Sequence, residues 1–382
     1  MDDGTSRGVP SAAVLPEPDG AAPEPTELVL LPWGSRRLVH ALAYQAPLRF
    51  AGRVLEVGTE VAMARVADML AARRLVRSQV LGNEPGLAPP ASGGRRVALY
   101  LHYAASGRIS PMVRAQLAAY RAQGFDVVLA SNAERVDEAG WRAASEHCWQ
   151  MLRRRNLGFD FGAWRDSAAL LLLGACPPEE LLLVNDSVMG PIRPLGTLLE
   201  RARAFGLGAV GMTESRQGGV HIQSYFLLVR GAAATADTLQ FLSQLRLSTA
   251  KWLIVQRGEF GLTRFLLQRG HRVAALFGYA RSLEAVLADW EERRYLAELM
   301  PQFARGAASA CTMQQMMLRW PLNPTIHLWR GLPRCMSFPF LKVELLRRNP
   351  GRLPGVADWP LLTGGDSSEM TEMLREHLSA LD

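Results

Sequence analysis

Lysine is almost missing from this chain of 382 residues, because Lys251 and Lys342 are its only lysines. The basic side of its net charge of +7 is therefore nearly all arginine, a skew that we attribute to genome base composition rather than to function. A modest positive excess suits anionic partners such as diphosphates or an anionic membrane surface. We find no basic stripe interleaved with aromatic residues, which argues against a nucleic-acid partner.

Cysteine is also scarce, and long apolar runs are absent. The four cysteines lie far apart without a CxxC pair, which excludes a zinc-finger or disulfide framework. The longest apolar run, Ala168 to Ala175, falls far short of the roughly 18 residues that span a bilayer. The first residues, Met1 to Gly4, lack the basic and then apolar order of a secretion signal. We therefore expect a cytoplasmic globular protein.

The chain divides by composition into four parts. Residues 1–27 are rich in Pro, Gly, Ala and acidic residues and predict a disordered leader. Residues 28–94 predict a helical N-terminal extension, with a helix over 61–80 and a linker rich in Pro and Gly over 82–94. We expect the main domain over residues 95–285 and a helical C-terminal extension or cap over 286–382.

The main domain alternates short apolar runs with amphipathic stretches. Strands are predicted at 97–101, 127–130 and 181–184, and helices at 111–123 and 138–146. This alternation is typical of a Rossmann-type α/β domain with a mainly parallel sheet. Ligands of such sheets bind at the carboxyl ends of the strands, so the segments after the three strands are the expected places for chemistry.

The densest motif is RRRNLGFDFGAWRD, residues 153–166. Its glycines allow a ligand to approach the backbone, its aromatic rings offer walls for a base or a sugar, and its arginines suit phosphates. The alternative is a structural turn that leads into a helix, with Trp164 packed in the core. The donor-binding residues predicted here are Arg155, Asn156, Gly158, Asp160, Phe161, Gly162, Trp164, Arg165 and Asp166.

A second motif, Asn185-Asp186-Ser187, directly follows the predicted strand 181–184. An acidic residue at this position suits a divalent cation that bridges a nucleotide diphosphate, and an oxygen-rich cluster suits Mg²⁺ or Mn²⁺. We predict Asp186 as the metal ligand and Asn185 and Ser187 as donor-binding residues. The alternative is an ordinary Asn-Asp-Ser loop.

A third motif, HIQSYFLL, begins at His221 and leads into an apolar strand. Alternation along a strand would place His221, Gln223 and Tyr225 on one face, where they can bond sugar hydroxyls. With Ser224 these residues form the predicted acceptor or sugar site. A single histidine is more often structural than catalytic, so sugar binding is preferred over acid-base catalysis for His221.

A fourth motif begins at Glu259, at the head of an amphipathic helix. Inverting sugar transfer needs a base that removes the acceptor proton, and a positioned carboxylate is the usual choice. We predict Glu259 as that base and Glu214 as the second candidate. The alternative is that the helix dipole alone favours a glutamate there.

Taken in order, these segments resemble the rhamnan-synthesis family of bacterial glycosyltransferases. The resemblance is carried by the blocks RRxNxGxDFGxWRD, LLLxNDS, HxQSYF and ExGLxR, and by Asn323-Pro324-Thr325 and Phe338 to Pro350. It implies a GT-A-like fold in which Asn185-Asp186-Ser187 stands for a DXD metal motif and Glu259 for the catalytic carboxylate. It also implies a nucleotide-sugar donor, typically dTDP-rhamnose, and a lipid-linked or polysaccharide acceptor in O-antigen, capsule or rhamnan synthesis, with peripheral contact to the inner membrane.

Two alternatives stay open. One is a transferase-like subunit without activity that serves as a scaffold in a polysaccharide assembly complex. The other is a Rossmann oxidoreductase, which is disfavoured because no GxGxxG follows the first predicted strand at 97–101.

Overall fold

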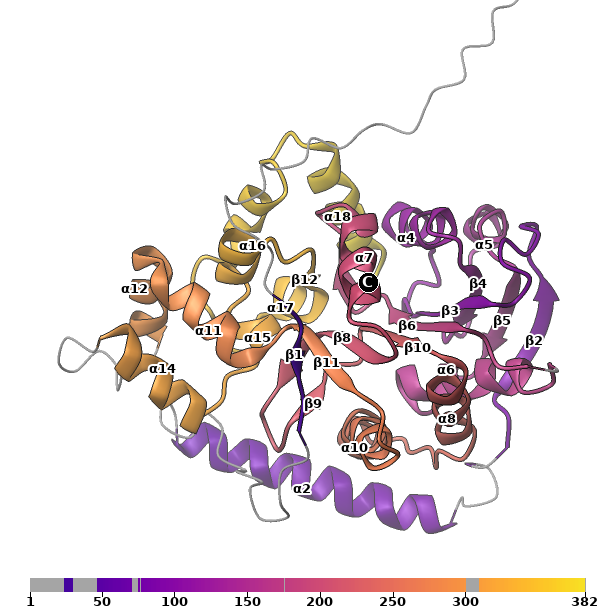
Figure 1. Ribbon diagram of the computed structural model, residues 1–382, viewed down its shortest axis with the longest axis horizontal. Coiled ribbons are helices and arrows are strands. Elements are labelled where there is room, and N and C mark those ends of the chain that lie inside the picture. Colours follow the sequence, from indigo (N-terminus) through magenta and orange to yellow (C-terminus); the bar gives the residue numbers. More distant parts are fainter. Residues whose placement is uncertain are drawn as a thin grey trace, which may run out of the picture.

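A twisted sheet with helices on both faces forms the centre of the protein in the computed structural model (Figure 1). The structure describes residues 24–29, 47–70, 75, 77–174, 176–299 and 309–381. The strand order is β1-β11-β8-β10-β6-β3-β4-β5-β2, and β9 pairs with β8. The strands are β1 (Thr26–Glu27), β2 (Val80–Pro85), β3 (Arg96–His102), β4 (Asp126–Ser131), β5 (Gln150–Arg154), β6 (Glu180–Asn185), β8 (Gly208–Ser215), β9 (His221–Ile222), β10 (Phe226–Arg230) and β11 (Val273–Phe277).

Most of the strands run in one direction. β3 pairs in parallel with β4 and β6, β4 with β5, and β11 with β8. The strands β1, β2 and β10 run the opposite way. The mixed α/β fold with a mostly parallel sheet is therefore confirmed, including the strands predicted at 97–101, 127–130 and 181–184.

The sheet is covered on both faces because its central strands are apolar on both faces. In β3, Ala98 and Tyr100 point to one core, and Val97 and Leu99 point to the other. The helices α4 (Pro111–Ala122), α5 (Glu138–Ser145), α7 (Leu195–Ala204) and α11 (Tyr279–Ala288) pack on the first side. The helices α6 (Phe159–Leu171), α8 (Ala232–Ser243) and α10 (Gly261–Gln268) pack on the second.

The N-terminal region differs in part from the sequence-based expectation. The helix predicted over 61–80 is α2 (Pro47–Leu70), which starts earlier and ends ten residues sooner. Val80–Pro85, which reaches into the predicted linker, is strand β2, and its edge position tolerates the terminal proline. Of the predicted leader, residues 1–23 lie outside the described residues, while Thr26–Glu27 pairs with β11.

The C-terminal region is helical and returns to the centre of the sheet. Its strand β12 (Leu341–Lys342) pairs antiparallel with β7 (Val188–Met189), which follows β6. None of the helices in the described residues combines the length and apolar character that a membrane crossing needs. The helices of this region are α12 (Trp290–Leu299), α14 (Ala310–Arg319), α15 (Pro324–His327), α16 (Gly331–Met336), α17 (Val343–Arg348) and α18 (Glu369–Ala380), with a 3-10 helix over Val356–Leu362.

Candidate active site

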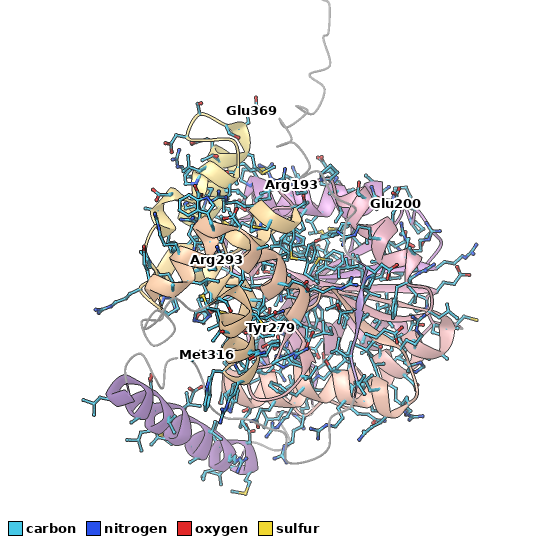
Figure 2. All side chains as sticks on the ribbon, turned by 60° about the vertical axis from the view of Figure 1, so that its left-hand side comes forward. Arg193, Glu200, Tyr279, Arg293, Met316 and Glu369 are labelled. Atoms are coloured by element: carbon cyan, nitrogen blue, oxygen red, sulfur yellow. The ribbon has the colours of Figure 1, made fainter. Side chains whose placement is uncertain are left out.

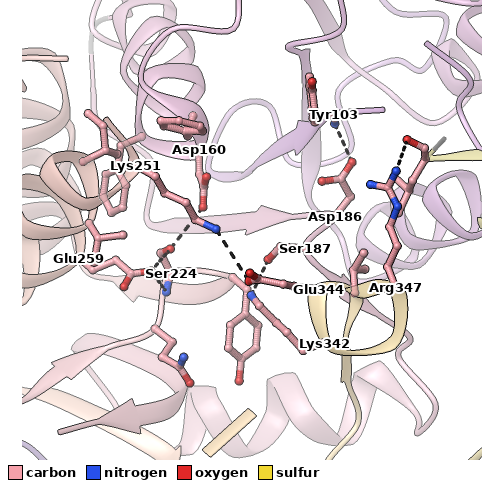
Figure 3. Close-up of a pocket in the computed structure, with 18 of the residues that line it drawn as sticks. Tyr103, Asp160, Asp186, Ser187, Ser224, Lys251, Glu259, Lys342, Glu344 and Arg347 are labelled. Carbon is pink, nitrogen blue, oxygen red and sulfur yellow. Dashed lines mark hydrogen bonds and ion pairs between the residues drawn. The ribbon is translucent and has the colours of Figure 1, made fainter. Parts of the chain in front are cut away.

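A cavity of about 320 Å³ opens at the carboxyl ends of β3 and β6 (Figure 3). The chain leaves β3 toward β4 on one side and reaches β6 on the other, so the cavity lies where the strand order reverses. This is the usual ligand position in open α/β sheets. The charged and polar residues that line it are Tyr103, Asp160, Asp186, Ser187, Gln223, Ser224, Tyr225, Lys251, Glu259, Lys342, Glu344, Arg347 and Arg348.

Asp186 joins the two strands that flank the cavity. It follows β6, and its Oδ2 accepts a hydrogen bond of 2.6 Å from the backbone N–H of Tyr103, which follows β3. Burial, and to a smaller extent the charge of Asp160, raise the pKa of Asp186 to about 7 against the opposing effect of the Tyr103 bond. Asp186 is thus a buried carboxyl group that lacks sufficient positive charge around it.

Asp160 approaches from the first turn of α6. The turn before this helix requires Gly158, which has φ +82° and whose Cβ would lie 2.7 Å from a Leu247 methyl. Asn185 Nδ2 donates to Asp160 Oδ2 at 2.9 Å. Burial, and then the charge of Glu259, raise the pKa of Asp160. The first and second motifs of the sequence therefore meet in one place.

Glu259 faces the same cavity from a π-helical turn, Gln256–Phe260, between α9 (Lys251–Val255) and α10. Its Oε1 accepts hydrogen bonds from the backbone N–H of Ser224 at 3.1 Å and from the Ser224 hydroxyl. His221 Nε2 lies 3.6 Å from Glu259 Oε2. Burial lowers the pKa of His221, and its Nδ1 lies 2.9 Å from the Gly219 carbonyl, which suits the neutral tautomer that donates from Nδ1.

The opposite wall carries positive charge from the C-terminal region. Lys342 Nζ donates to Ser187 Oγ at 3.0 Å and lies 5.3 Å from the centre of the Tyr225 ring. Burial, and then repulsion by Lys251, lower the pKa of Lys342. Lys251 Nζ lies 3.9 Å from Glu344 Oε2 across the cavity. Both lysines of the chain therefore line this one cavity.

Eight of the eighteen predicted site residues line this cavity, and two more contact them. Figure 3 shows Asp160, Ser224 and Glu259 on one side and Asp186 on the other, with Ser187 and Lys342 between them. Asn185 and His221 contact these residues through Asp160 and Glu259. The predicted residues that line the cavity are Asp160, Phe161, Asp186, Ser187, Gln223, Ser224, Tyr225 and Glu259.

The end of the first motif lies in the core instead. The Trp164 indole N–H donates to the Leu99 carbonyl at 3.1 Å, as the structural alternative expected. Asp166 pairs with Arg165 and with Arg154, each at 3.1 Å, and accepts from the Gln79 backbone N–H. Because Arg165 also donates to backbone carbonyls of the segment before β2, this buried network secures that segment and has no contact with the cavity.

Other predicted donor-binding residues also lie away from the cavity lining. Arg155 and Asn156 are exposed, and Asn156 Oδ1 accepts from Asn132 Nδ2 at 3.2 Å. A Cβ on Gly162 would lie 2.1 Å from the Leu157 carbonyl oxygen, so this glycine is needed for the close packing of the turn.

Glu214 and the third motif also differ from expectation. Glu214 accepts from Arg216 Nε at 2.6 Å and from the Tyr279 backbone N–H at 3.1 Å, and it lines a different hollow beside β1. His221, Gln223 and Tyr225 do not share one strand face, because β9 ends at Ile222 and β10 begins at Phe226. Gln223 and Tyr225 still meet, since both hydrogen-bond Thr213 Oγ1 at 2.7 Å.

Comparison with known proteins finds a match over the region that contains the four motifs. The model of the family described as Rhamnan synthesis protein F matches residues 127–298. The chain carries this family region. The family resemblance drawn from the sequence is thereby confirmed over these residues, which make up less than half of the chain.

Two relatives and one solved structure extend the comparison. The chain is 29% identical to "Uncharacterized protein y4gN" of Sinorhizobium fredii over 44% of this chain and 45% of that protein. It is 28% identical to "Virulence protein VirA" of Vibrio anguillarum over 54% of this chain and 65% of that protein. The chain thus spans about half to two thirds of these relatives. A structure of the mannosyltransferase PcManGT from Pyrobaculum calidifontis, in complex with GDP-Man and Mn²⁺, is similar over 85% of this chain and 90% of that chain, with a TM-score of 0.32 and 13% identity.

Six of the charged and polar residues that line the cavity were not predicted: Tyr103, Lys251, Lys342, Glu344, Arg347 and Arg348. Lys342 lies in a segment that carries the family resemblance but has no assigned role there. The rarity of lysine was the available signal. A chain that uses arginine almost everywhere else has both of its lysines at this cavity, where a compact ammonium and a planar guanidinium are not interchangeable.

Proposed function

We propose that the chain is a glycosyltransferase that binds a nucleotide sugar in this cavity and transfers the sugar to a lipid-linked or polysaccharide acceptor. The observation that carries the proposal is the juxtaposition of two walls. The half-buried carboxyl groups of Asp160 and Glu259 stand on one side, and the buried Asp186 carboxyl group stands on the other with Ser187 and Lys342. An activated sugar has this same polarity, with an anionic diphosphate at one end and a hydroxyl-rich ring at the other.

The diphosphate is assigned to the wall with Lys342, Ser187 and Arg347. Asp186 and Asp160 supply two carboxyl groups beside it, and both have a raised pKa because burial leaves their charge uncompensated. Within the described ranges, three or more His, Cys, Asp or Glu side chains do not gather as a metal-binding group. Two carboxylates plus substrate phosphates are nevertheless the usual set for Mg²⁺, so these residues fit a Mg²⁺ or Mn²⁺ ion that would neutralise the leaving diphosphate.

Glu259 is assigned as the base. In a direct displacement, the acceptor oxygen bonds to the anomeric carbon, the bond from that carbon to the diphosphate oxygen breaks, and its electrons leave with the nucleotide. The acceptor proton passes to Glu259 Oε2. The two Ser224 hydrogen bonds hold Oε1 and orient the carboxylate, while neutral His221 stands beside Oε2.

The sugar lies between these walls, close to Gln223, Ser224 and Tyr225. These residues offer an amide, a hydroxyl and an aromatic face, the groups that bind sugar hydroxyls and ring carbons. The resemblance to the rhamnan synthesis family supports dTDP-rhamnose as the donor and a growing surface polysaccharide as the product.

A thermal-shift screen of nucleotide sugars, with and without Mn²⁺, tests donor binding, because a ligand of the native state raises the melting temperature. We expect dTDP-rhamnose to bind, Asp186→Ala to weaken the Mn²⁺-dependent shift, and Glu259→Gln to bind donor without transferring the sugar. Asp237→Ala, a substitution of a carboxylate outside the cavity, is the control for binding. No shift with any nucleotide sugar would refute the transferase. Binding without turnover by the unsubstituted protein, against all acceptors offered, would instead support the inactive subunit.

A further inference from the structure

Helix α2 carries an apolar face that points away from the protein. We call this face the outer stripe, and its side chains are between 53% and 88% exposed. Figure 2 shows α2 at the edge of the molecule, and Figure 1 shows it below the sheet beside α10 and β9. The outer stripe consists of Leu48, Leu55, Met63, Val66, Met69 and Leu70.

Sequence spacing places these residues on one side of the helix. Successive members are separated by seven, eight, three, three and one residues, so all fall within one broad arc at 3.6 residues per turn. Gly52, Thr59 and Ala62 lie in the same arc and carry no charge. The Thr59 hydroxyl donates to the Glu56 carbonyl at 2.8 Å, so its polar group is satisfied within the helix.

The opposite side of α2 is anchored, and this anchor fixes which side faces outward. Ala64 packs with Ala250 and Leu253 near α9. Asp68 is buried, accepts from Ser248 Oγ at 3.1 Å, and pairs with Arg257 at 3.2 Å. Rotation of the helix about its axis would separate Asp68 from Arg257. Breaking a buried ion pair in this way is strongly destabilising.

We propose that the outer stripe of α2 docks the protein on an anionic lipid surface. In sequence, α2 holds three arginines and three acidic residues, of which Asp68 is already paired with Arg257, and three more arginines, Arg73, Arg74 and Arg77, follow it without a further acidic residue. An apolar stripe flanked by excess arginine is the composition of helices that lie in the interface of an anionic bilayer. The proposal does not depend on the transferase activity.

A second copy of the chain fits the outer stripe less well. Helix pairing needs apolar knobs at alternating spacings of three and four residues. If Leu48, Leu55, Ala62 and Met69 form one set of knobs, the positions between them are Ala51, Gly58 and Arg65, which are two small residues and a charge. A lipid surface needs no such register.

The position of α2 relates this surface to the cavity. α2 packs against α9, and α9 contributes Lys251, Ile254 and Val255 to the cavity lining. Two packed helices, α2 and α9, each about 10 Å in diameter, therefore separate a bilayer at the outer stripe from the proposed site. A lipid-linked acceptor would then remain in the bilayer while its sugar end reaches the cavity.

Co-sedimentation of the full chain with lipid vesicles tests the proposal. We compare vesicles of phosphatidylcholine alone with vesicles that also contain phosphatidylglycerol. The unsubstituted protein should partition into the anionic vesicles, and the double variant L55Q/V66Q should lose at least about tenfold in partition coefficient, since two buried apolar side chains are lost. The matched control L173Q/L207Q removes two exposed leucines elsewhere and should bind like the unsubstituted protein.

Further measurements separate the other occupants. Equal partition of the unsubstituted protein and L55Q/V66Q, or no binding to anionic vesicles, would overturn the proposal. A lipid-free dimer that L55Q/V66Q converts to monomer in gel filtration would assign the outer stripe to a second copy instead. A fall in melting temperature confined to L55Q/V66Q would show that the chain itself covers the stripe. Donor binding should be equal in all of these variants. The vesicle result can therefore be interpreted even if the proposed transferase function is wrong.

Discussion

Asp186→Asn should make the protein more stable and at the same time less active. The pKa of the Asp186 carboxyl is about 7 in the folded chain, against an ordinary 3.8. The folded state therefore binds this proton more tightly than the unfolded state. Between about pH 4 and pH 7 the unfolded carboxyl is ionised while the folded one is still protonated, so ionisation of Asp186 lowers the free energy of unfolding as the pH rises.

The size of the effect follows from the difference in pKa. A gap of about 3 pH units corresponds to at most about 4 kcal/mol, at about 1.4 kcal/mol per unit. The asparagine keeps an oxygen for the Tyr103 N–H but avoids the buried charge. Allowing for local relaxation around a buried carboxyl pair, we expect a gain of roughly 1–2 kcal/mol at pH 8, or about 2–4 °C in melting temperature. The gain should be small near pH 4, where the folded carboxyl is protonated and the unfolded one is close to half protonated.

Thermal melts of both proteins in EDTA at pH 8 and near pH 4 measure this difference. Asp166→Asn is the matched control, because Asp166 is equally buried but pairs with Arg154 and Arg165, so its loss should destabilise the protein. An Asp186→Asn protein that is less stable than the unsubstituted one at pH 8 would refute the reasoning. So would a gain of the same size at both pH values.

Three further predictions concern the cavity, and a fourth concerns Glu214 outside it. Lys342→Ala should lower kcat/KM for the donor about 10²-fold, by loss of the charge that faces the leaving diphosphate, and Lys342→Arg should restore only part of it, as steady-state kinetics will show. Lys251→Ala should change the same constant less than about threefold, because that side chain is 68% exposed and its charge is screened. Metal-dependent donor affinity should rise with pH up to about 7 as Asp186 loses its proton, and calorimetric titrations across that range would contradict this if affinity stayed flat. Glu214→Gln should lower the melting temperature by loss of its Arg216 bond while kcat stays near that of the unsubstituted protein, in contrast to Glu259→Gln.

The sequence predicted the parts of the fold that depend on local pattern. β3, β4 and β6 are short apolar runs buried on both faces, and such runs can be predicted as strands from the sequence alone. β2 was missed because an edge strand with Gly82 and Pro85 has the composition of a linker. Its structure comes from pairing with β5, which lies about 65 residues later in the chain.

Most acidic residues of the candidate site were predicted from the sequence, and its basic residues were missed. Asp160, Asp186 and Glu259 belong to dense local motifs, and the structure brings them together. Trp164 and Asp166 belong to the same motif as Asp160, yet they lie in the core, because a polar and aromatic pattern does not say which side of a helix faces a ligand. Lys342 lies on a strand of two residues, which is too short to show the alternation of apolar and polar residues that predicts a strand.

Because β12 pairs with β7, the proposed site cannot be separated from the C-terminal region without losing part of its lining. A fragment trimmed to residues 127–298 would keep Asp186 and Glu259 but would lack both Tyr103, which orients the first, and Lys342, which opposes the second. Exchange of the C-terminal segment between related proteins should therefore change the affinity for the nucleotide. The proposed base, Glu259, should keep its surroundings. One wall of the cavity thus depends on a stretch of chain that lies more than 150 residues from the strand with which it pairs.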